Sequence, residues 1–399
     1  SIVLGGTLMA MGAFTLMFKS QMMFLLGLSL LIVGNGLFKP NISTLVGKLY
    51  KQGDARRDGG FTIFYMGINL GAFLAPIICR AVAGAMGTEG KPDYRYGFMA
   101  AGVGMVLGIF VFWRGFGTLG DKGLPPAGRE GMGDTVKVAL GCLCTVPVIY
   151  SLMNAKEIAG YAMMTLMVGI FAYLLYVGMK SDTAGRQRIY ALILLLLCNI
   201  VFWASFEQAG NSLNFFARDH INALTLGKWA MPFEWFQSVN AIFIVGLGPV
   251  FAWLWVWLDR RGANPSIPFK FGIGLVQVGL GFMLLLASFK GADAAGRVPY
   301  YMLTGLYLIH TTGELCVSPV GLSMITKLAP PSITGLVMGG WFLSIANANY
   351  AAGWISSLAG QSEVGETTKG GVEALSNYTA AFTPIIWMSI GVGGALLLS

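Results

Sequence analysis

The chain has 399 residues, of which 55% are hydrophobic and only 11% are charged, and its formal net charge is +8. Soluble domains carry about a quarter charged residues, so this composition excludes an ordinary soluble fold. Lys and Arg are spread over short connections and form no basic stripe, which argues against a nucleic-acid-binding protein. Apolar stretches long enough to cross roughly 30 Å of hydrocarbon as helices recur along the chain. The composition therefore predicts an all-α, polytopic membrane protein that lies in a lipid bilayer.

Twelve apolar segments follow one another along the chain. They cover residues 1–18, 22–49, 60–84, 95–115, 134–153, 157–179, 188–217, 233–259, 267–290, 298–328, 333–360 and 377–399. The first residue, Ser1, is followed at once by an apolar run without a start methionine. We therefore expect the chain to begin inside a longer protein.

Basic residues are concentrated in every second connection between the apolar segments. The clearest examples are Lys48 with Lys51, Lys122 with Arg129, Lys180 with Arg186, and Arg260 with Arg261. By the positive-inside rule these connections are cytoplasmic, and both ends of the chain then lie on the cytoplasmic side.

A Gly- and Pro-rich stretch, GFGTLGDKGLPPAGREGMG (115–133), interrupts the apolar pattern after the fourth segment. Such a composition is typical of a flexible linker, so we expect a first helical bundle to end here and a second to follow. Twelve spans would suit a complete six-plus-six transporter, but a linker after the fourth segment does not divide them evenly.

Few ionisable side chains fall deep within the predicted spans: Lys39, Glu207, His310 and Glu314. A charge at mid-membrane costs at least a few kcal/mol, so such residues usually face a wet cavity and serve function. The alternative is that they pair only to hold helices together. His310 stands one helical turn before Glu314, and we interpret it as a packing or hydrogen-bonding residue.

Prolines accompany two of these charges. Pro40 follows Lys39 in GNGLFKPN, and Pro319 follows Glu314 in GELCVSPVG. Proline removes a backbone donor and crowds the carbonyl four residues back, so both helices are expected to bend or loosen there. Irregular helices in two halves are typical of a transporter site, although Gly and Pro are also simply common in membrane helices.

The signs of the charges suggest a zwitterionic ligand. A cation in the first bundle and acids in the second could hold the two ends of a short peptide, whose termini lie roughly 6 to 10 Å apart for two or three residues. Three pairs at helical spacing could supply hydroxyl, amide and aromatic contacts. They are Tyr65 with Asn69, Gln237 with Asn240, and Trp341 with Ser344. Each pair alone is weak evidence, because polar residues also join membrane helices.

At FTIFYMGINLGAF (61–73) the sequence resembles the signature of the proton-coupled oligopeptide transporter family of the major facilitator superfamily. GNGLFKPNIS resembles the family's fourth helix, FWASFEQAGNSL its seventh, FQSVNAIFI its eighth and GELCVSPVGLSMI its tenth. The likeness covers essentially the whole chain. It implies the major facilitator fold, two helical bundles, with two extra helices inserted between them and the family's first two spans absent.

The resemblance also implies a division of the chain. Residues 1–115 would form the N-terminal bundle with family helices three to six, residues 116–187 the linker with the inserted pair, and residues 188–399 the C-terminal bundle with helices seven to twelve.

Position by position, the resemblance implies roles in substrate binding and proton coupling. Lys39 would contact the peptide carboxylate and take part in coupling, Glu314 would receive the amino group with Asn69 and Asn240, and Glu207 would carry the proton. The remaining cavity residues would be Tyr65, Gln237, Trp341 and Ser344.

One family feature is missing. The family's first helix carries an ExxERF motif whose charges pair with the lysine and the seventh-helix acid, and this chain has none. We therefore expect these 399 residues alone not to be a competent transporter, although the parent protein should be.

The resulting hypothesis is proton-driven symport of di- and tripeptides into the cytoplasm by a monomer in a bacterial cytoplasmic membrane. The alternative on the same scaffold is a carrier of another small solute such as nitrate, a drug or a sugar. A membrane enzyme is disfavoured because only two histidines, His220 and His310, are present and no catalytic or metal-binding cluster is evident. We likewise predict no cofactor and no nucleic-acid partner. A channel or a sensor without transport would lack flux coupled to a pH gradient.

Overall fold

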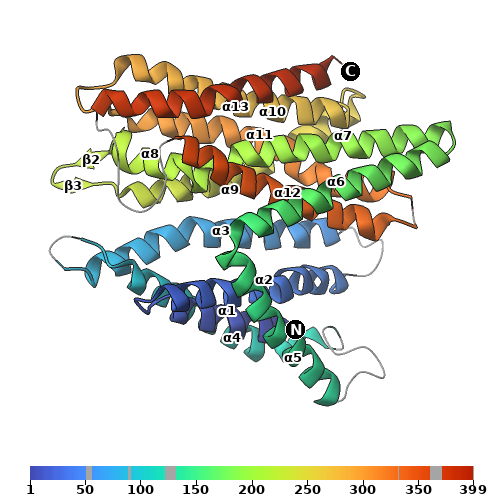
Figure 1. Cartoon of the computed structure of the whole chain (residues 1–399), viewed down its shortest axis with the longest axis horizontal. Helices are drawn as coiled ribbons and strands as arrows, with labels where there is room; N and C mark the ends of the chain where they lie inside the picture. The colour runs from blue at the N-terminus through green and yellow to red at the C-terminus, as the bar shows by residue number, and fades with distance from the viewer. Residues whose placement is uncertain are drawn as a thin grey trace. The chain divides into compact units, whose positions relative to one another are not determined.

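The computed structural model describes residues 1–50, 56–88, 91–120, 122, 132–330, 332–359 and 371–398. Within these ranges each of the twelve predicted segments forms a helix, which confirms the all-α class (Figure 1). Nine helices of the described part are long and apolar enough to cross a membrane. Lys51, Arg129 and most of the predicted Gly- and Pro-rich linker lie outside the described residues.

Contacts divide the chain into two compact units, Ser1–Ala159 (unit 1) and Gly160–Ser399 (unit 2). The boundary falls in the first turn of α6 (Lys156–Lys180), which follows α5 (Met132–Asn154); these are the two helices that the sequence predicts as an inserted pair. By its contacts α5 belongs to unit 1, where it packs on α2. The division at residues 115 and 187 stays a prediction.

Unit 1 also contains α1 (Ile2–Thr15), α2 (Gln21–Lys48), α3 (Arg56–Ala85), α4 (Tyr94–Arg114) and the short η1 (Phe116–Leu119). Helix α1 packs against α2 and α4, and α3 packs against α4. The α1–α2 contact depends on small residues, because a Cβ placed on Gly12 would lie 2.6 Å from the carbonyl oxygen of Gly27. Glycine is therefore required for this close approach of two membrane helices.

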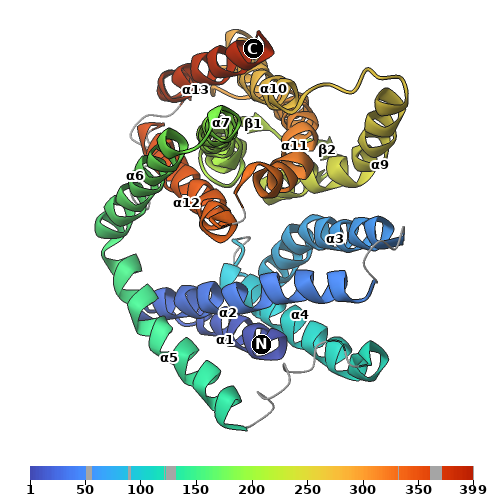
Figure 2. The same cartoon turned by 90° about the vertical axis from the view of Figure 1, so that its right-hand side faces the viewer.

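Unit 2 contains α6 from Gly160 onward, and the apolar α7 (Thr183–Phe206) follows. The other helices are η2 (Glu207–Gly210), α8 (Ser212–His220), η3 (Phe233–Ser238), α9 (Val239–Arg260), α10 (Ile267–Ser288), η4 (Phe289–Gly291), α11 (Tyr300–Leu328), α12 (Thr334–Leu358), η5 (Gly371–Glu373) and α13 (Ala374–Leu397). Helix α10 packs against α11 and α13, and α12 packs against α7 (Figure 2). Buried aromatic rings such as Phe202, Phe282 and Phe382 fill the centre of this unit.

Side-chain caps set where several helices begin. Asp93 accepts from the backbone N–H of Arg95 at the start of α4, Asp182 accepts from Gly185 N at the start of α7, and Ser266 Oγ accepts from Phe269 N at the start of α10. Each cap satisfies a backbone donor that the first helical turn leaves without a partner. The hydrogen bond from the Arg95 side chain also holds the pKa of the Asp93 carboxyl below its usual value.

The outer surfaces of both units carry large apolar side chains. Trp113 is 66% exposed, Val168 66% and Trp253 62%. Surfaces of this kind need an apolar solvent, so they fit a chain whose helices lie in lipid.

Short strands and side-chain hydrogen bonds connect loops of unit 2. The strands β1 (Ile221–Asn222) and β4 (Val298–Pro299) pair in parallel, and β2 (Thr225–Leu226) and β3 (Trp229–Ala230) form a small antiparallel hairpin. His220 Nδ1 donates to the carbonyl oxygen of Gly296 at 2.9 Å, and Asn222 Nδ2 donates to Asp293 Oδ2 at 3.2 Å. These contacts tie the end of α8 to the α10–α11 connection.

Candidate substrate-binding site

Glu314 lies in the middle of α11 and is 8% exposed. It accepts a hydrogen bond at 3.0 Å on Oε2 from the side-chain amide of Asn240, which is near the start of α9. The same amide nitrogen donates to Thr311 Oγ1 at 3.0 Å. Glu314 has no ion pair with any described residue. This buried acid thus receives a hydrogen bond from the Asn240 amide, and no cation of the described residues pairs with it.

Glu207 stands where α7 changes into the short 3₁₀ helix η2. Its side chain is half-buried, and its backbone carbonyl accepts from Asn211 Nδ2 at 2.8 Å. Glu207 and Glu314 lie close enough for their charges to interact. Unit 2 therefore brings together the two acids that the sequence singled out.

Gln237 lies in η3, directly before α9, and connects this region to η2 and α8. Its Nε2 donates to the carbonyl oxygen of Ala209 at 2.6 Å and to Asn214 Oδ1 at 3.1 Å. Both amide hydrogens are thereby used inside unit 2, so Gln237 shapes the surroundings of Glu207 and has only its carbonyl oxygen left for a ligand.

Trp341 and Ser344 lie one turn apart on α12, as their spacing predicts, but in buried positions. Trp341 is 5% exposed and Ser344 is fully buried. Ser344 Oγ donates to the carbonyl oxygen of Trp341 at 2.7 Å and accepts from Asn199 Nδ2, in α7, at 2.8 Å. The hydroxyl is thus engaged in the α7–α12 contact, and its predicted contact with substrate stays a prediction.

Lys39 lies in α2 of unit 1, with an exposed side chain and no ion pair to a described residue. Helix α2 continues through Pro40. Asn41, Ser43 and Thr44 each donate from their side chains to the carbonyl four residues back. These bonds supply extra donors around the proline. Helix α11 likewise continues through position 319, where the proline side chain lies outside the described part.

Tyr65 and Asn69 share one face of α3. Asn69 is 6% exposed and its Nδ2 donates to the carbonyl oxygen of Tyr65 at 3.0 Å, whereas the side chain of Tyr65 is 42% exposed. The i, i+4 spacing therefore brings the two residues together as predicted.

His310 has the packing and hydrogen-bonding position that its sequence context predicts. The ring is 1% exposed, its Nε2 donates to the carbonyl oxygen of Val278 at 3.0 Å, and it packs on Phe282 with the ring centres 5.0 Å apart. With one nitrogen bonded and the ring enclosed by aromatic residues, His310 connects α11 to α10.

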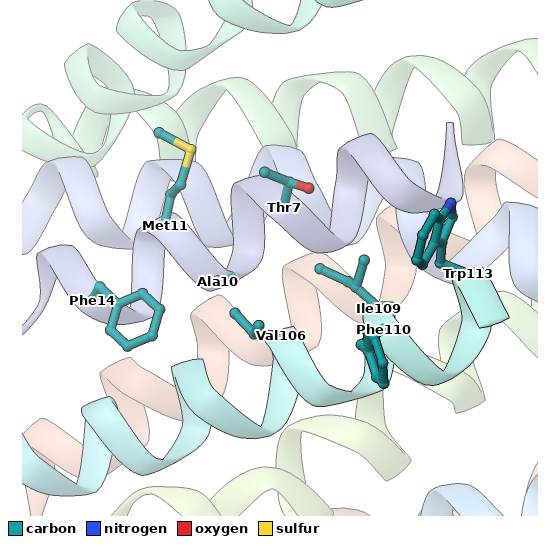
Figure 3. Close-up of a pocket in the computed structure, with 8 residues that line it drawn as sticks. All are labelled: Thr7, Ala10, Met11, Phe14, Val106, Ile109, Phe110 and Trp113. Atoms are coloured by element: carbon teal, nitrogen blue, oxygen red, sulfur yellow. The ribbon is translucent and has the colours of Figure 1, made fainter.

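Two apolar grooves lie elsewhere, in unit 1. The first, about 420 Å³, is lined by residues of α1 and α4, including Met11, Phe14 and Trp113 (Figure 3). The second, about 290 Å³, adds Phe38 and Ile42 of α2. Neither groove contains a predicted site residue. The described residues also contain no group of three or more His, Cys, Asp or Glu side chains placed to hold a metal ion.

Sequence reasoning missed several residues of these networks, among them Thr311 and Asn199. Thr311 precedes Glu314 by three positions, so helical spacing alone places it on the same face. Asn199 lies inside an otherwise apolar helix, which is itself a signal of a hydrogen bond between membrane helices. Its partner, Ser344, could not be found from the sequence because the pairing of α7 with α12 is tertiary.

Comparison with known sequences identifies relatives over nearly the whole chain. The POT family profile matches residues 1–370. A peptide transporter of Yersinia enterocolitica, YePEPT, is 35% identical over 375 residues, which is 88% of this chain and 72% of the relative. A di-/tripeptide transporter of Lactococcus lactis is 34% identical over 363 residues, covering 86% of this chain and 71% of the relative.

Solved structures of POT family transporters are similar to this chain over its whole length. A mutant of the peptide transporter POT in complex with alafosfalin has a TM-score of 0.81 at 34% identity, covering 100% of this chain and 78% of the other. A POT family transporter in complex with 5-aminolevulinic acid has a TM-score of 0.78 at 27% identity, covering 100% of this chain and 80% of the other. The chain is therefore a multi-pass membrane protein of the major facilitator fold, and it belongs to the POT family.

Proposed function

We propose that this protein is a proton-driven symporter of di- and tripeptides, working as a monomer in a bacterial cytoplasmic membrane and importing its substrates by alternating access. The observation that carries this proposal is the environment of Glu314. An acid within a membrane helix, 8% exposed, receives only the Asn240 amide and the described residues offer it no cation. An unpaired acid at this depth is costly, so a cationic ligand is its natural partner.

A second charge of opposite sign completes the substrate class. Lys39 is exposed on unit 1 and has no acidic partner among the described residues. Lys39 would bind the peptide carboxylate, and Glu314 with Asn69 and Asn240 would bind the amino group. Two acceptors for an ammonium and one cation for a carboxylate match the two ends of a short peptide. The names of the relatives, which include di- and tripeptide transporters, support this class.

Because the site would hold termini and backbone, the peptide side chains would meet generic surfaces. Tyr65, Gln237, Trp341 and Ser344 would line these surfaces, as the family resemblance implies. Binding energy would come mainly from the charged ends. The transporter would therefore accept many different dipeptides and tripeptides, and a longer chain would separate its termini too far for both contacts.

Glu207 would carry the proton. It is an acid at the junction of α7 and η2, half-buried and without an ion pair in the described part of the chain. When ionised it would favour a cationic partner that closes one side of the transporter, and protonation would remove the charge and release that contact. Proton entry would thus be linked to opening, and peptide and proton would leave together into the cytoplasm.

The test of this function is uptake of a labelled dipeptide into liposomes that contain the full-length protein. Glu207→Gln should abolish accumulation driven by an inside-alkaline pH gradient, while counterflow exchange, which needs no gradient, continues. Glu157→Gln makes the same charge change at an exposed position at the start of α6 and is the matched control. Proton-driven accumulation that survives Glu207→Gln would remove Glu207 as the carrier, and a wild-type protein that accumulates no dipeptide would remove the function.

A carrier of another small solute on the same fold is the second candidate. It is favoured by one finding, that a POT family structure 27% identical to this chain was solved with 5-aminolevulinic acid, which also carries an amine and a carboxylate. Competition decides between the two. Dipeptides that fail to displace a labelled non-peptide amino acid would favour this candidate.

A further inference from the structure

Thr311 is the residue of the Glu314 network to which the proposed function assigns no role. It lies one turn before Glu314 on α11 and is fully buried. Its hydroxyl donates to the backbone carbonyl of Tyr307 at 2.7 Å. Since a hydroxyl carries a single proton, Oγ1 can then only accept a hydrogen bond. Thr311 therefore presents a pure acceptor to whatever lies opposite.

The group opposite Thr311 is the side-chain amide of Asn240. Its Nδ2 donates to Thr311 Oγ1 and to Glu314 Oε2, both at 3.0 Å. The two hydrogens of the amide are thus both used. If the amide turned over, its carbonyl oxygen would face the Thr311 hydroxyl oxygen and the Glu314 carboxylate oxygen, the two atoms that now accept from it. The pair of acceptors consequently selects one of the two orientations of Asn240.

The selected orientation determines what the site can offer to a ligand. With both amide hydrogens engaged, Asn240 has only its carbonyl oxygen left, and Glu314 has its second oxygen, Oε1. Neither atom has a hydrogen bond within the described part of the chain. The side chain of Asn240 is half-buried, and neither its oxygen nor Glu314 Oε1 is among the buried polar atoms without a hydrogen bond, so both oxygens are open to a ligand. Two acceptors and no donor suit an ammonium group, which has three donors and no acceptor.

We infer that Thr311 is a positioning residue for substrate selection: by accepting from Asn240 it keeps the Asn240 carbonyl oxygen directed at the peptide amino group. The inference rests on the proposed function, since it assumes that a peptide amino group binds at Glu314. Without the hydroxyl, the Asn240 amide would keep one anchor instead of two and could turn its N–H groups toward the ammonium. Binding of a free amino terminus would then weaken, whereas a neutral acetylated terminus, which makes no ammonium contact, would lose little.

The experiment compares two ligands in competition for uptake by the full-length protein: dialanine and N-acetyl-dialanine. Thr311→Val keeps the shape of the side chain and removes the hydroxyl, and Thr311→Ser keeps the hydroxyl and removes a methyl group. We expect Thr311→Val to weaken dialanine about five- to tenfold, the worth of roughly one hydrogen bond, and N-acetyl-dialanine less than twofold. Thr311→Ser should restore the wild-type ratio of the two affinities.

The outcomes separate this inference from the proposed function. If the wild-type protein does not distinguish dialanine from N-acetyl-dialanine, the amino-group site fails and both ideas fall. If the wild type distinguishes them and Thr311→Val does so equally well, or loses both ligands to the same extent, the positioning role alone is wrong. Thr311→Ala, which also lacks the oxygen, replaces Thr311→Val if thermal melting shows that the valine variant does not fold.

Discussion

Replacing Glu314 by glutamine is the substitution with the clearest expected effect on substrate binding. The two side chains have the same shape, and the carbonyl oxygen of the introduced glutamine could still accept from Asn240, whose nitrogen now lies 3.0 Å from the Glu314 oxygen. The change therefore removes the charge and leaves the protein contact in place. Any loss of binding should come from the interaction with the ligand's amino group.

The size of that loss follows from the burial of Glu314, which is 8% exposed. An ammonium and a carboxylate 4 Å apart interact with about 4 kcal/mol at an effective dielectric constant of 20. A neutral amide that still accepts a hydrogen bond retains part of this energy. We therefore expect a loss of about 2 to 3 kcal/mol, or roughly 30- to 150-fold in affinity for a free dipeptide.

Competition for counterflow in liposomes measures this loss. Dialanine should weaken by the factor above in Glu314→Gln, while N-acetyl-dialanine, which has no ammonium, should change less than threefold. Glu157→Gln, exposed on α6, should change neither. Equal losses for the free and the acetylated peptide would refute the assignment of Glu314 to the amino group.

Three further predictions concern the fold. Gly12→Ala should cost about 1 to 3 kcal/mol of stability, because the added Cβ would lie 2.6 Å from the Gly27 carbonyl oxygen. Gly36→Ala is the control, since a Cβ on Gly36 meets nothing within 4 Å. The melting temperature of Gly12→Ala should therefore lie clearly below that of Gly36→Ala. Ser344→Ala should lower the melting temperature by leaving the buried Asn199 amide without its acceptor, a cost of about 1 to 3 kcal/mol, and an unchanged melting temperature with weaker peptide binding would instead favour a direct substrate contact. The backbone N–H of Arg297, the Asn222 amide and the N–H of Ala295 hold the pKa of Asp293 below its usual value. The contribution of Asp293 to stability should be complete above the usual aspartate pKa of about 4 and disappear as the pH falls through the lower folded-state value. Between pH 5 and 2 the melting temperature should therefore fall less steeply for Asp293→Asn than for the wild type.

The helices could be predicted from the sequence because their signal is local. Runs of about twenty apolar residues, separated by Gly, Pro and charged residues, specify membrane spans without knowledge of their partners. Which helices pack together could not be predicted in the same way. The Gly12–Gly27 contact and the Asn199–Ser344 bond join residues whose spacing carries no pairing signal.

The sequence predicted those residues of the candidate site whose type is rare in membrane helices. Glu207 and Glu314 are conspicuous because charges are costly in apolar helices, and unit 2 brings them together. Ser344 and Trp341 were selected by resemblance and spacing, which did not reveal that both are buried. Thr311 escaped notice because threonines in membrane helices commonly bond their own backbone, and only the second bond, from Asn240, distinguishes this one.

The most direct test of the account is a competition series on the wild-type, full-length protein with four ligands: dialanine, N-acetyl-dialanine, dialanine amide and the doubly capped peptide. If Lys39 and Glu314 hold the two charged ends, capping either end should weaken competition by one to two orders of magnitude, and capping both should abolish it. A doubly capped peptide that competes as well as free dialanine would contradict the central claim.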